Sequence, residues 1–229
     1  MGTILDVVRS PARGMRETSE RGAMPGFVVV ALWTLVSLLA AGLGLLLGGF
    51  ASADEFLENL PPGAVPQEVN EQELEGIIVG FQAVGVGLRS LWPFIYWPVL
   101  TLVMYLITRF FGGGGTLSGM FGAMGAACVP FVISGLLQLP IMGAQAALAT
   151  GGDPGTASVV IGTVGGLLSL AFLVWHVALV IVGAAAARRI SYGKSGGSCA
   201  ISCAAVIGIP LLLLILFSAL LAAFGAAGG

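Results

Sequence analysis

The chain has 229 residues, of which 57% are hydrophobic and only 9% are charged, and its mean hydropathy is +1.03. An ordinary soluble domain carries about 25% charged residues, so this composition excludes a water-soluble globule. The apolar stretches are continuous and do not alternate with period two, which excludes a membrane β-barrel. A net charge of -2 without a basic stripe argues against nucleic-acid binding. We therefore predict an all-α polytopic membrane protein.

Residues 1–24 are polar and of mixed charge, and they precede the first apolar run. Their apolar residues fit a short amphipathic helix on the cytoplasmic membrane surface, with a break near Pro11. The segment contains acids and the following apolar run is long, so a cleaved signal peptide is not expected.

After this N-terminal segment, residues 25–229 are predicted to form a single membrane domain. A membrane-spanning helix needs about 20 apolar residues, and five such spans fit this domain. Residues 51–76 form an acidic, extracytoplasmic segment without Lys or Arg. Residues 77–88 are expected to form an interfacial helix before the second span, and the glycine run 112–115 a flexible turn. Asp153 falls in a short loop. The third span holds Pro130 in its middle and ends before Pro140. The five predicted spans are 25–50, 90–109, 117–139, 158–187 and 198–224.

The basic residues set the expected orientation. The segment before the first span, the 109–116 turn and the 188–197 turn hold eight of the nine Lys and Arg residues, and five spans put all three on one side. This is the positive-inside pattern of a plasma (inner) membrane protein with a cytoplasmic N-terminus and an extracytoplasmic C-terminus.

Small residues at helical spacing predict where the helices pack, because lipid removes the hydrophobic drive between membrane helices. Gly44 and Gly48 form one GxxxG pair, and Gly162 and Gly166 form another. The longest stripe lies on the third span, which we place at the centre of the bundle, with dimerisation as the alternative role. Its packing residues are Gly115, Gly119, Gly122, Ala123 and Pro130.

His176, Gln138 and Ser134 form a candidate intramembrane polar site. We interpret His176 as a neutral side chain that is hydrogen-bonded across helices, because no Asp or Glu lies inside a predicted span to complete a proton relay. A functional role as a proton carrier or substrate contact is the alternative. Neither Ser118 nor Ser134 stands in a Gly-x-Ser-Gly pattern, although a Ser–His dyad stays open on geometry.

No motif predicts a catalytic residue, a metal or a cofactor. Gly193-Lys194-Ser195 ends like a phosphate-binding loop, but Arg188 stands where the loop's first glycine is required. The cysteines Cys128, Cys199 and Cys203 are interpreted as small packing residues. We interpret Arg188, Arg189 and Lys194 as a cytoplasmic basic turn that anchors the topology, and contact with anionic lipid or a cytoplasmic partner is the alternative.

Several strings resemble the Yip-one domain family, the Ypt/Rab-interacting membrane proteins, in its prokaryotic form. They are Pro25-Gly26-Phe27, Arg109-Phe-Phe-Gly-Gly-Gly-Gly115, Ala126-Ala-Cys-Val-Pro-Phe131, Trp175-His-Val-Ala-Leu and Arg189-Ile-Ser-Tyr-Gly-Lys194. The resemblance implies five spans and a cytoplasmic N-terminus. Eukaryotic members associate with prenylated Rab GTPases in vesicle traffic. Here only 24 residues stand in place of their long N-terminal region, so GTPase binding is not expected.

The leading hypothesis is a non-enzymatic scaffold or adaptor that organises lipids, membrane-protein partners or a homo-oligomer through small-residue helix faces and basic turns. A small transporter or permease subunit is the alternative, and it requires a polar cavity between spans two, three and four. An intramembrane hydrolase is the third hypothesis, and it requires Ser118 or Ser134 within hydrogen-bond reach of His176.

Overall fold

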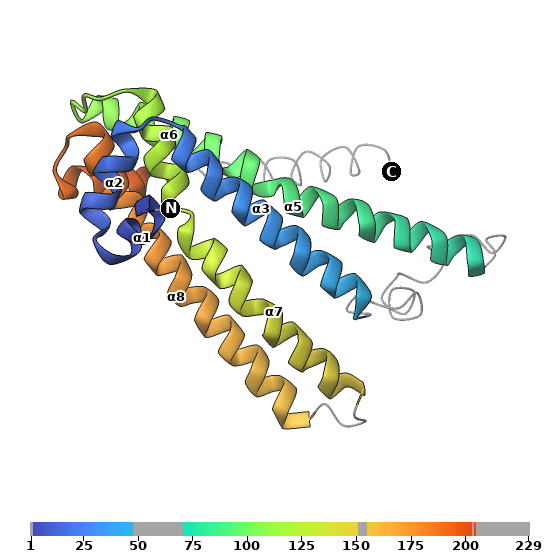
Figure 1. Ribbon diagram of the computed structural model, residues 1–229. Coiled ribbons are helices and arrows are strands. Elements are labelled where there is room, and N and C mark those ends of the chain that lie inside the picture. The colour runs from blue at the N-terminus through green and yellow to red at the C-terminus, as the bar shows by residue number, and fades with distance from the viewer. Residues whose placement is uncertain (1, 48–70, 151–154, 203, 205–229) are drawn as a thin grey trace, which may run out of the picture. The chain divides into compact units, whose positions relative to one another are not determined.

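The computed structural model describes residues 2–47, 71–150, 155–202 and 204. Throughout these ranges the chain is helical between short turns, and they contain no strand (Figure 1). Four stretches are long and apolar enough to cross a membrane: Met24–Gly44, Val84–Phe110, Leu117–Leu148 and Val159–Arg188. The predicted all-α membrane fold is confirmed. The predicted fifth span from residue 205 onward, the acidic segment through residue 70, Gly48 and the Asp153 loop lie outside the described residues.

Seven helices are labelled in Figure 1, and a further helix starts at residue 192 and includes residues 192–202. The labelled helices are α1 (Gly2–Arg9), α2 (Pro11–Glu20), α3 (Met24–Leu46), α5 (Glu71–Phe110), α6 (Leu117–Ala126), α7 (Val129–Thr150) and α8 (Gly155–Arg188).

The chain forms two compact units that interleave along the sequence. Unit 1 comprises Met1–Gly26, Trp97–Ala127 and Val177–Gly229, and unit 2 comprises Phe27–Tyr96 and Cys128–His176. The N-terminal segment therefore packs into the same unit as the end of α5, all of α6 and the end of α8. It is not a separate body beside the membrane helices.

In unit 1, α1 and α2 form a helical hairpin with its break at Ser10 and Pro11. The residue before a proline is disfavoured in the α conformation, whereas proline itself suits the first turn of a helix. Gly14 lets the helices approach closely, because a Cβ atom there would lie 2.5 Å from the Val7 backbone nitrogen. Val7 and Met15 are buried between the helices and their neighbours.

The α6 helix presents glycines to the end of the N-terminal hairpin and to the start of α3 in unit 1. A Cβ atom at Gly122 would overlap the carbonyl oxygen of Gly22, and one at Gly125 would overlap the Gly26 backbone. Close backbone approach of this kind is how small residues join membrane helices. Ala123 is fully buried beside these glycines.

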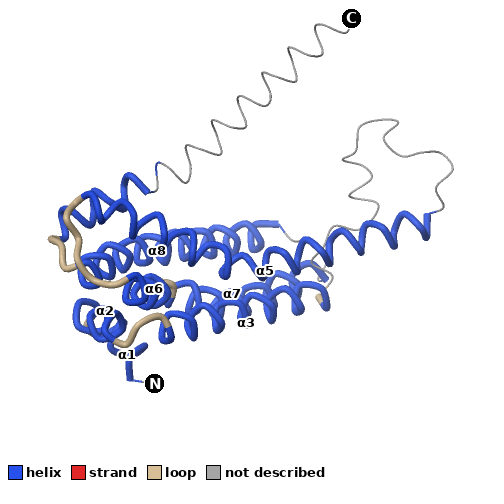
Figure 2. Tube along the Cα trace, turned by 90° about the horizontal axis from the view of Figure 1, so that it is seen from above, coloured by secondary structure: helices blue, strands red, loops and turns tan. Residues whose placement is uncertain are grey.

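In unit 2, α3 and α7 lie side by side (Figure 2), with Gly135 facing the Val36 side chain. The α7 and α8 helices also run together (Figure 1) and are joined by a hydrogen bond from Gln138 to Ser169. On α3, Trp33 stacks on Phe131 of α7 with ring centroids 4.7 Å apart.

Two helix boundaries differ from the sequence prediction. Residues 77–88 and 90–109 belong to the single helix α5, which continues through Pro93 and Pro98. The α7 helix likewise continues through Pro140 to Thr150 instead of ending at residue 139. A proline removes one backbone donor, but breaking a helix in an apolar layer would leave many more groups unsatisfied, so the helix persists.

Pro130 is also placed differently from its predicted position in mid-helix. The chain turns at residues 127–128, between α6 and α7, and Pro130 is the second residue of α7. No intrahelical bond is lost there, because the first N–H groups of a helix have no partner inside it.

We expect Gly122→Ala to lower the free energy of unfolding by about 1–3 kcal/mol, because the new methyl group meets rigid backbone. Gly42→Ala on α3 is the matched control, since nothing lies within 4 Å of a Cβ atom there. Denaturation in detergent micelles measures both variants. Equal stability of the two would contradict the proposed backbone contact.

Candidate functional site

The structure places His176 in an aromatic cluster in unit 2. The side chain is 2% exposed, and its Nε2 atom lies 2.8 Å from the Tyr96 hydroxyl of α5. The Phe131 ring lies against the imidazole, with centroids 4.4 Å apart. Trp33 contacts both Tyr96 and Phe131. The imidazole is thus held by a neutral hydroxyl and an apolar ring.

Ser134 and Gln138 lie one helical turn apart on α7 and meet Ser169 of α8. The Gln138 amide nitrogen is 3.1 Å from the Ser169 hydroxyl and 3.4 Å from the Ser134 hydroxyl. Ser169 in turn donates to the Gly165 carbonyl oxygen at 2.9 Å. This row of hydrogen bonds satisfies polar groups in an environment where an unsatisfied one costs several kcal/mol.

The candidate polar site therefore consists of two groups, His176 with Tyr96 and Ser134 with Gln138 and Ser169. Within the described part of the chain, Ser134 bonds to Gln138 and makes no hydrogen bond to His176, so these two residues form no Ser–His dyad. The described residues also hold no cluster of three or more His, Cys, Asp or Glu side chains that could bind a metal ion.

The sequence analysis missed Tyr96 and Ser169 as partners. Neither residue was singled out from the sequence. A helical-spacing signal was present, because Ser169 lies seven residues before His176 and Ser134 lies four residues before Gln138. Residues at these intervals share a helix face.

Arg188, predicted as part of a cytoplasmic basic turn, is the second site of interest. It is the last residue of α8 and is only 2% exposed. Its guanidinium donates to the carbonyl oxygens of Gly113 at 2.6 Å and Gly115 at 2.9 Å, and to the Thr108 hydroxyl at 3.2 Å. It also lies 4.3 Å from the centre of the Tyr105 ring. Neutral oxygens and an aromatic face compensate the buried charge.

The glycine run gives Arg188 its acceptors. Gly112 and Gly115 have φ values of 77°, a left-handed conformation that glycine adopts readily. A Cβ atom at Gly115 would also overlap the carbonyl oxygen of Ala187. Gly115 is therefore a turn residue and does not belong to the packing stripe of the α6 helix. The run is a fixed acceptor loop and not only a flexible connection.

Arg189 and Lys194 are the other two residues of the predicted basic turn. Lys194 is exposed, and its Nζ atom lies 3.4 Å from the Phe111 carbonyl oxygen. Arg189 is exposed and follows α8 with φ 55°, while Ile190 donates its backbone N–H to the Ala185 carbonyl oxygen at 3.2 Å. This bond pattern is a Schellman helix end, in which glycine is the usual left-handed residue.

Substituting Arg188 with Ala should lower the free energy of unfolding by about 3 kcal/mol, because three acceptors lose a charged donor and the Tyr105 ring loses its cation. Arg188→Lys should recover only part of this loss, since an ammonium cannot reproduce the planar fork. Thermal unfolding in detergent ranks the variants, with the exposed Arg109→Ala as the control. An Arg188→Ala protein as stable as this control would contradict the assigned role.

Tyr96→Phe should cost about 1 kcal/mol by removing the hydroxyl from His176. The exposed Tyr192→Phe change serves as the control and should be neutral. A double-mutant cycle with His176→Ala, measured by detergent-induced unfolding, isolates the pair. Additive losses in that cycle would mean that the hydroxyl and the imidazole do not interact.

One comparison with known proteins found a match, to a family model. The model of the Yip1 domain family matches residues 5–215, which is most of the chain. No curated protein and no solved structure matches it. The family match covers the N-terminal hairpin, the glycine turn, Arg188 and the aromatic cluster, and it confirms the resemblance read from the sequence. This chain is a membrane protein of the Yip1 domain family.

Proposed function

We propose that this protein is a non-enzymatic scaffold or adaptor of the plasma (inner) membrane, which organises membrane partners or lipids. Membership of the Yip1 family supports a membrane role. The partner we propose is a membrane protein, either a different chain or a second copy.

The polar side chains of unit 2 favour a scaffold over a transporter. His176 is hydrogen-bonded with Tyr96, and Gln138 with Ser134 and Ser169, so these groups are used inside the protein. A cavity of about 290 Å³ in the same unit is lined by apolar residues. A transport site would instead present unsatisfied polar groups to a wet cavity. The lining residues are Pro140, Ile141, Ala144, Val160, Ile161 and Val164.

The observation that carries the proposal is an exposed glycine pair on α8. Gly162 and Gly166 are both exposed, and nothing lies within 4 Å of a Cβ atom at Gly166. The GxxxG spacing lets the backbone of a second helix approach closely. The glycines of α6 are already used within unit 1, whereas this pair is open to a partner helix.

The proposed orientation rests on where the basic residues gather. Unit 1 holds four of the nine Lys and Arg residues in Met1–Gly26, one in Trp97–Ala127 and three in Val177–Gly229, which makes eight. By the positive-inside rule this unit faces the cytoplasm. The N-terminus is then cytoplasmic and the acidic segment 51–76 lies on the other side, and the predicted fifth span, 198–224, would carry the C-terminus to that other side as well.

The test is cross-linking in native membranes, followed by affinity purification in mild detergent and mass spectrometry. We expect wild-type protein to recover a stoichiometric membrane partner, and Gly166→Leu to lower that recovery at least severalfold. Gly80→Leu on α5 is the matched control, because a Cβ atom there is also unobstructed. Equal recovery with all three proteins, or no partner with wild type, would contradict the adaptor role.

A further inference from the structure

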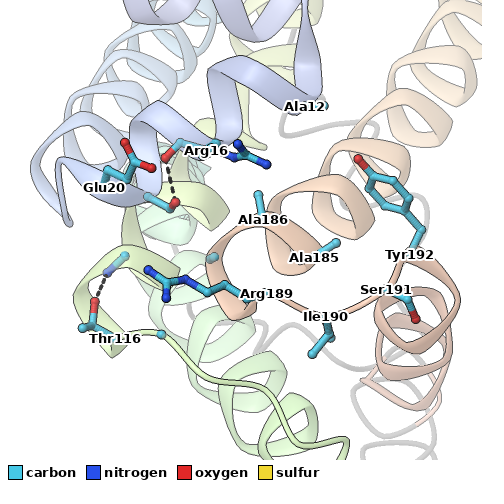
Figure 3. Close-up of a pocket in the computed structure, with 14 residues that line it drawn as sticks. Ala12, Arg16, Glu20, Thr116, Ala185, Ala186, Arg189, Ile190, Ser191 and Tyr192 are labelled. Atoms are coloured by element: carbon cyan, nitrogen blue, oxygen red, sulfur yellow. Dashed lines mark hydrogen bonds between the residues drawn. The ribbon is translucent and has the colours of Figure 1, made fainter.

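A polar cavity of about 820 Å³ opens in unit 1 between α2, the start of α6 and the turn after α8 (Figure 3). Gly115, whose carbonyl oxygen accepts from Arg188, also lines this cavity. Half of the lining residues are Ala, Gly or Ile, and the other half carry hydroxyl, guanidinium or carboxylate groups. These polar lining residues include Arg16, Ser19, Thr116, Arg189, Ser191 and Tyr192.

Two arginines enter the cavity from opposite walls, Arg16 from α2 and Arg189 from the turn after α8 (Figure 3). Neither guanidinium makes a hydrogen bond or an ion pair within the described part of the chain. Arg13, on the same helix as Arg16, instead bonds to Glu17 at 3.0 Å, which raises the pKa of Arg13. The two cavity arginines are thus available to a ligand.

The backbone at Arg189 adds a second argument. It holds φ 55° at a helix end where glycine is the usual residue, and a side chain is disfavoured in this conformation. Backbone strain of this kind is concentrated at functional positions. Here the strained residue carries its guanidinium into the cavity.

The chemistry of the cavity selects the ligand class. Guanidinium groups bind phosphate through paired charge-assisted hydrogen bonds, and the hydroxyls of Ser191 and Tyr192 are further donors. Glu20 also lines the cavity, so two positive charges exceed one negative charge. The volume falls within the usual range for small-ligand sites and has room for a phosphate with an organic substituent.

We propose that Arg16 and Arg189 together bind a phosphate group in this cavity, carried by an anionic lipid headgroup or by free phosphate. The site goes beyond the adaptor role and does not rest on it, because a chain without protein partners would bind the anion equally well. A basic cavity beside an anionic leaflet is also electrostatically suited to lipid.

The experiment titrates the full-length protein in nanodiscs and follows its melting temperature. One arm adds inorganic phosphate to phosphatidylcholine nanodiscs, with chloride at matched ionic strength as the reference. The other arm replaces part of the phosphatidylcholine with phosphatidylglycerol. A rise only in the lipid arm assigns a headgroup, a rise only in the first arm assigns free phosphate, and a rise in both assigns the phosphate group itself. No rise in either arm overturns the proposal.

Variants separate binding in the cavity from a general charge effect. Arg16→Gln and Arg189→Gly should each weaken the apparent affinity about tenfold or more, whereas Glu20→Gln should strengthen it. Arg109→Gln, an exposed arginine outside the cavity, should respond as wild type does.

Arg189→Gly also guards against a folding artefact, because glycine suits φ 55° and should keep or raise the melting temperature without anion. If Arg16→Gln and Arg189→Gly respond to both probes as wild type does, the cavity is not the site and the proposal fails.

Discussion

The burial of one charged side chain constrains much of unit 1. The Arg188 guanidinium cannot be buried without several acceptors, and a run of glycines brings two carbonyl oxygens to it. This requirement fixes three parts of the chain relative to one another. They are the end of α5, which contributes Thr108, the glycine turn after α5, and the end of α8, which carries Arg188. Because Gly115 packs on the Ala187 carbonyl, the same contact sets where Thr116 caps α6. Three helix ends are therefore positioned by one residue.

The remaining contacts of unit 1 build on these helix ends. The α6 helix carries the glycines that receive the N-terminal hairpin, and the residue after Arg188 turns into the polar cavity. In unit 2, uncharged polar groups also find hydrogen-bond partners on neighbouring helices. These groups are hydroxyl, amide and imidazole side chains. Both units use polar groups to hold helices together. The exposed glycines of α8 and the two cavity arginines are groups that stay available to other molecules.

Composition and hydropathy were enough to predict the helical membrane fold, because a chain with so few charges cannot form an ordinary soluble domain, and the family resemblance came from five short strings. The sequence could not show that Arg188 is buried. Adjacent Arg188 and Arg189 look alike as a basic turn, and only the tertiary position of Gly113 and Gly115 separates a buried residue from an exposed one. The predicted end of the third span at residue 139 was wrong because it relied on Pro140. Proline ends helices in water but is tolerated inside a helix in an apolar layer. The hydrogen bond of Tyr96 to His176 joins residues 80 positions apart, which no local pattern can reveal.

The central claim is that the polar groups of unit 2 serve cohesion and are closed to water. Cysteine accessibility in native membranes tests it most directly. The background is a chain in which Cys128, Cys199 and Cys203 are replaced by Ala. A single cysteine then replaces Ser134, Ser169 or the exposed Tyr192. Membranes that carry each variant are treated with a membrane-impermeant maleimide from one side or the other. The account predicts labelling at position 192 from one side and protection at positions 134 and 169 from both sides. Labelling at 134 or 169 would show a water-filled path and would contradict the scaffold in favour of transport.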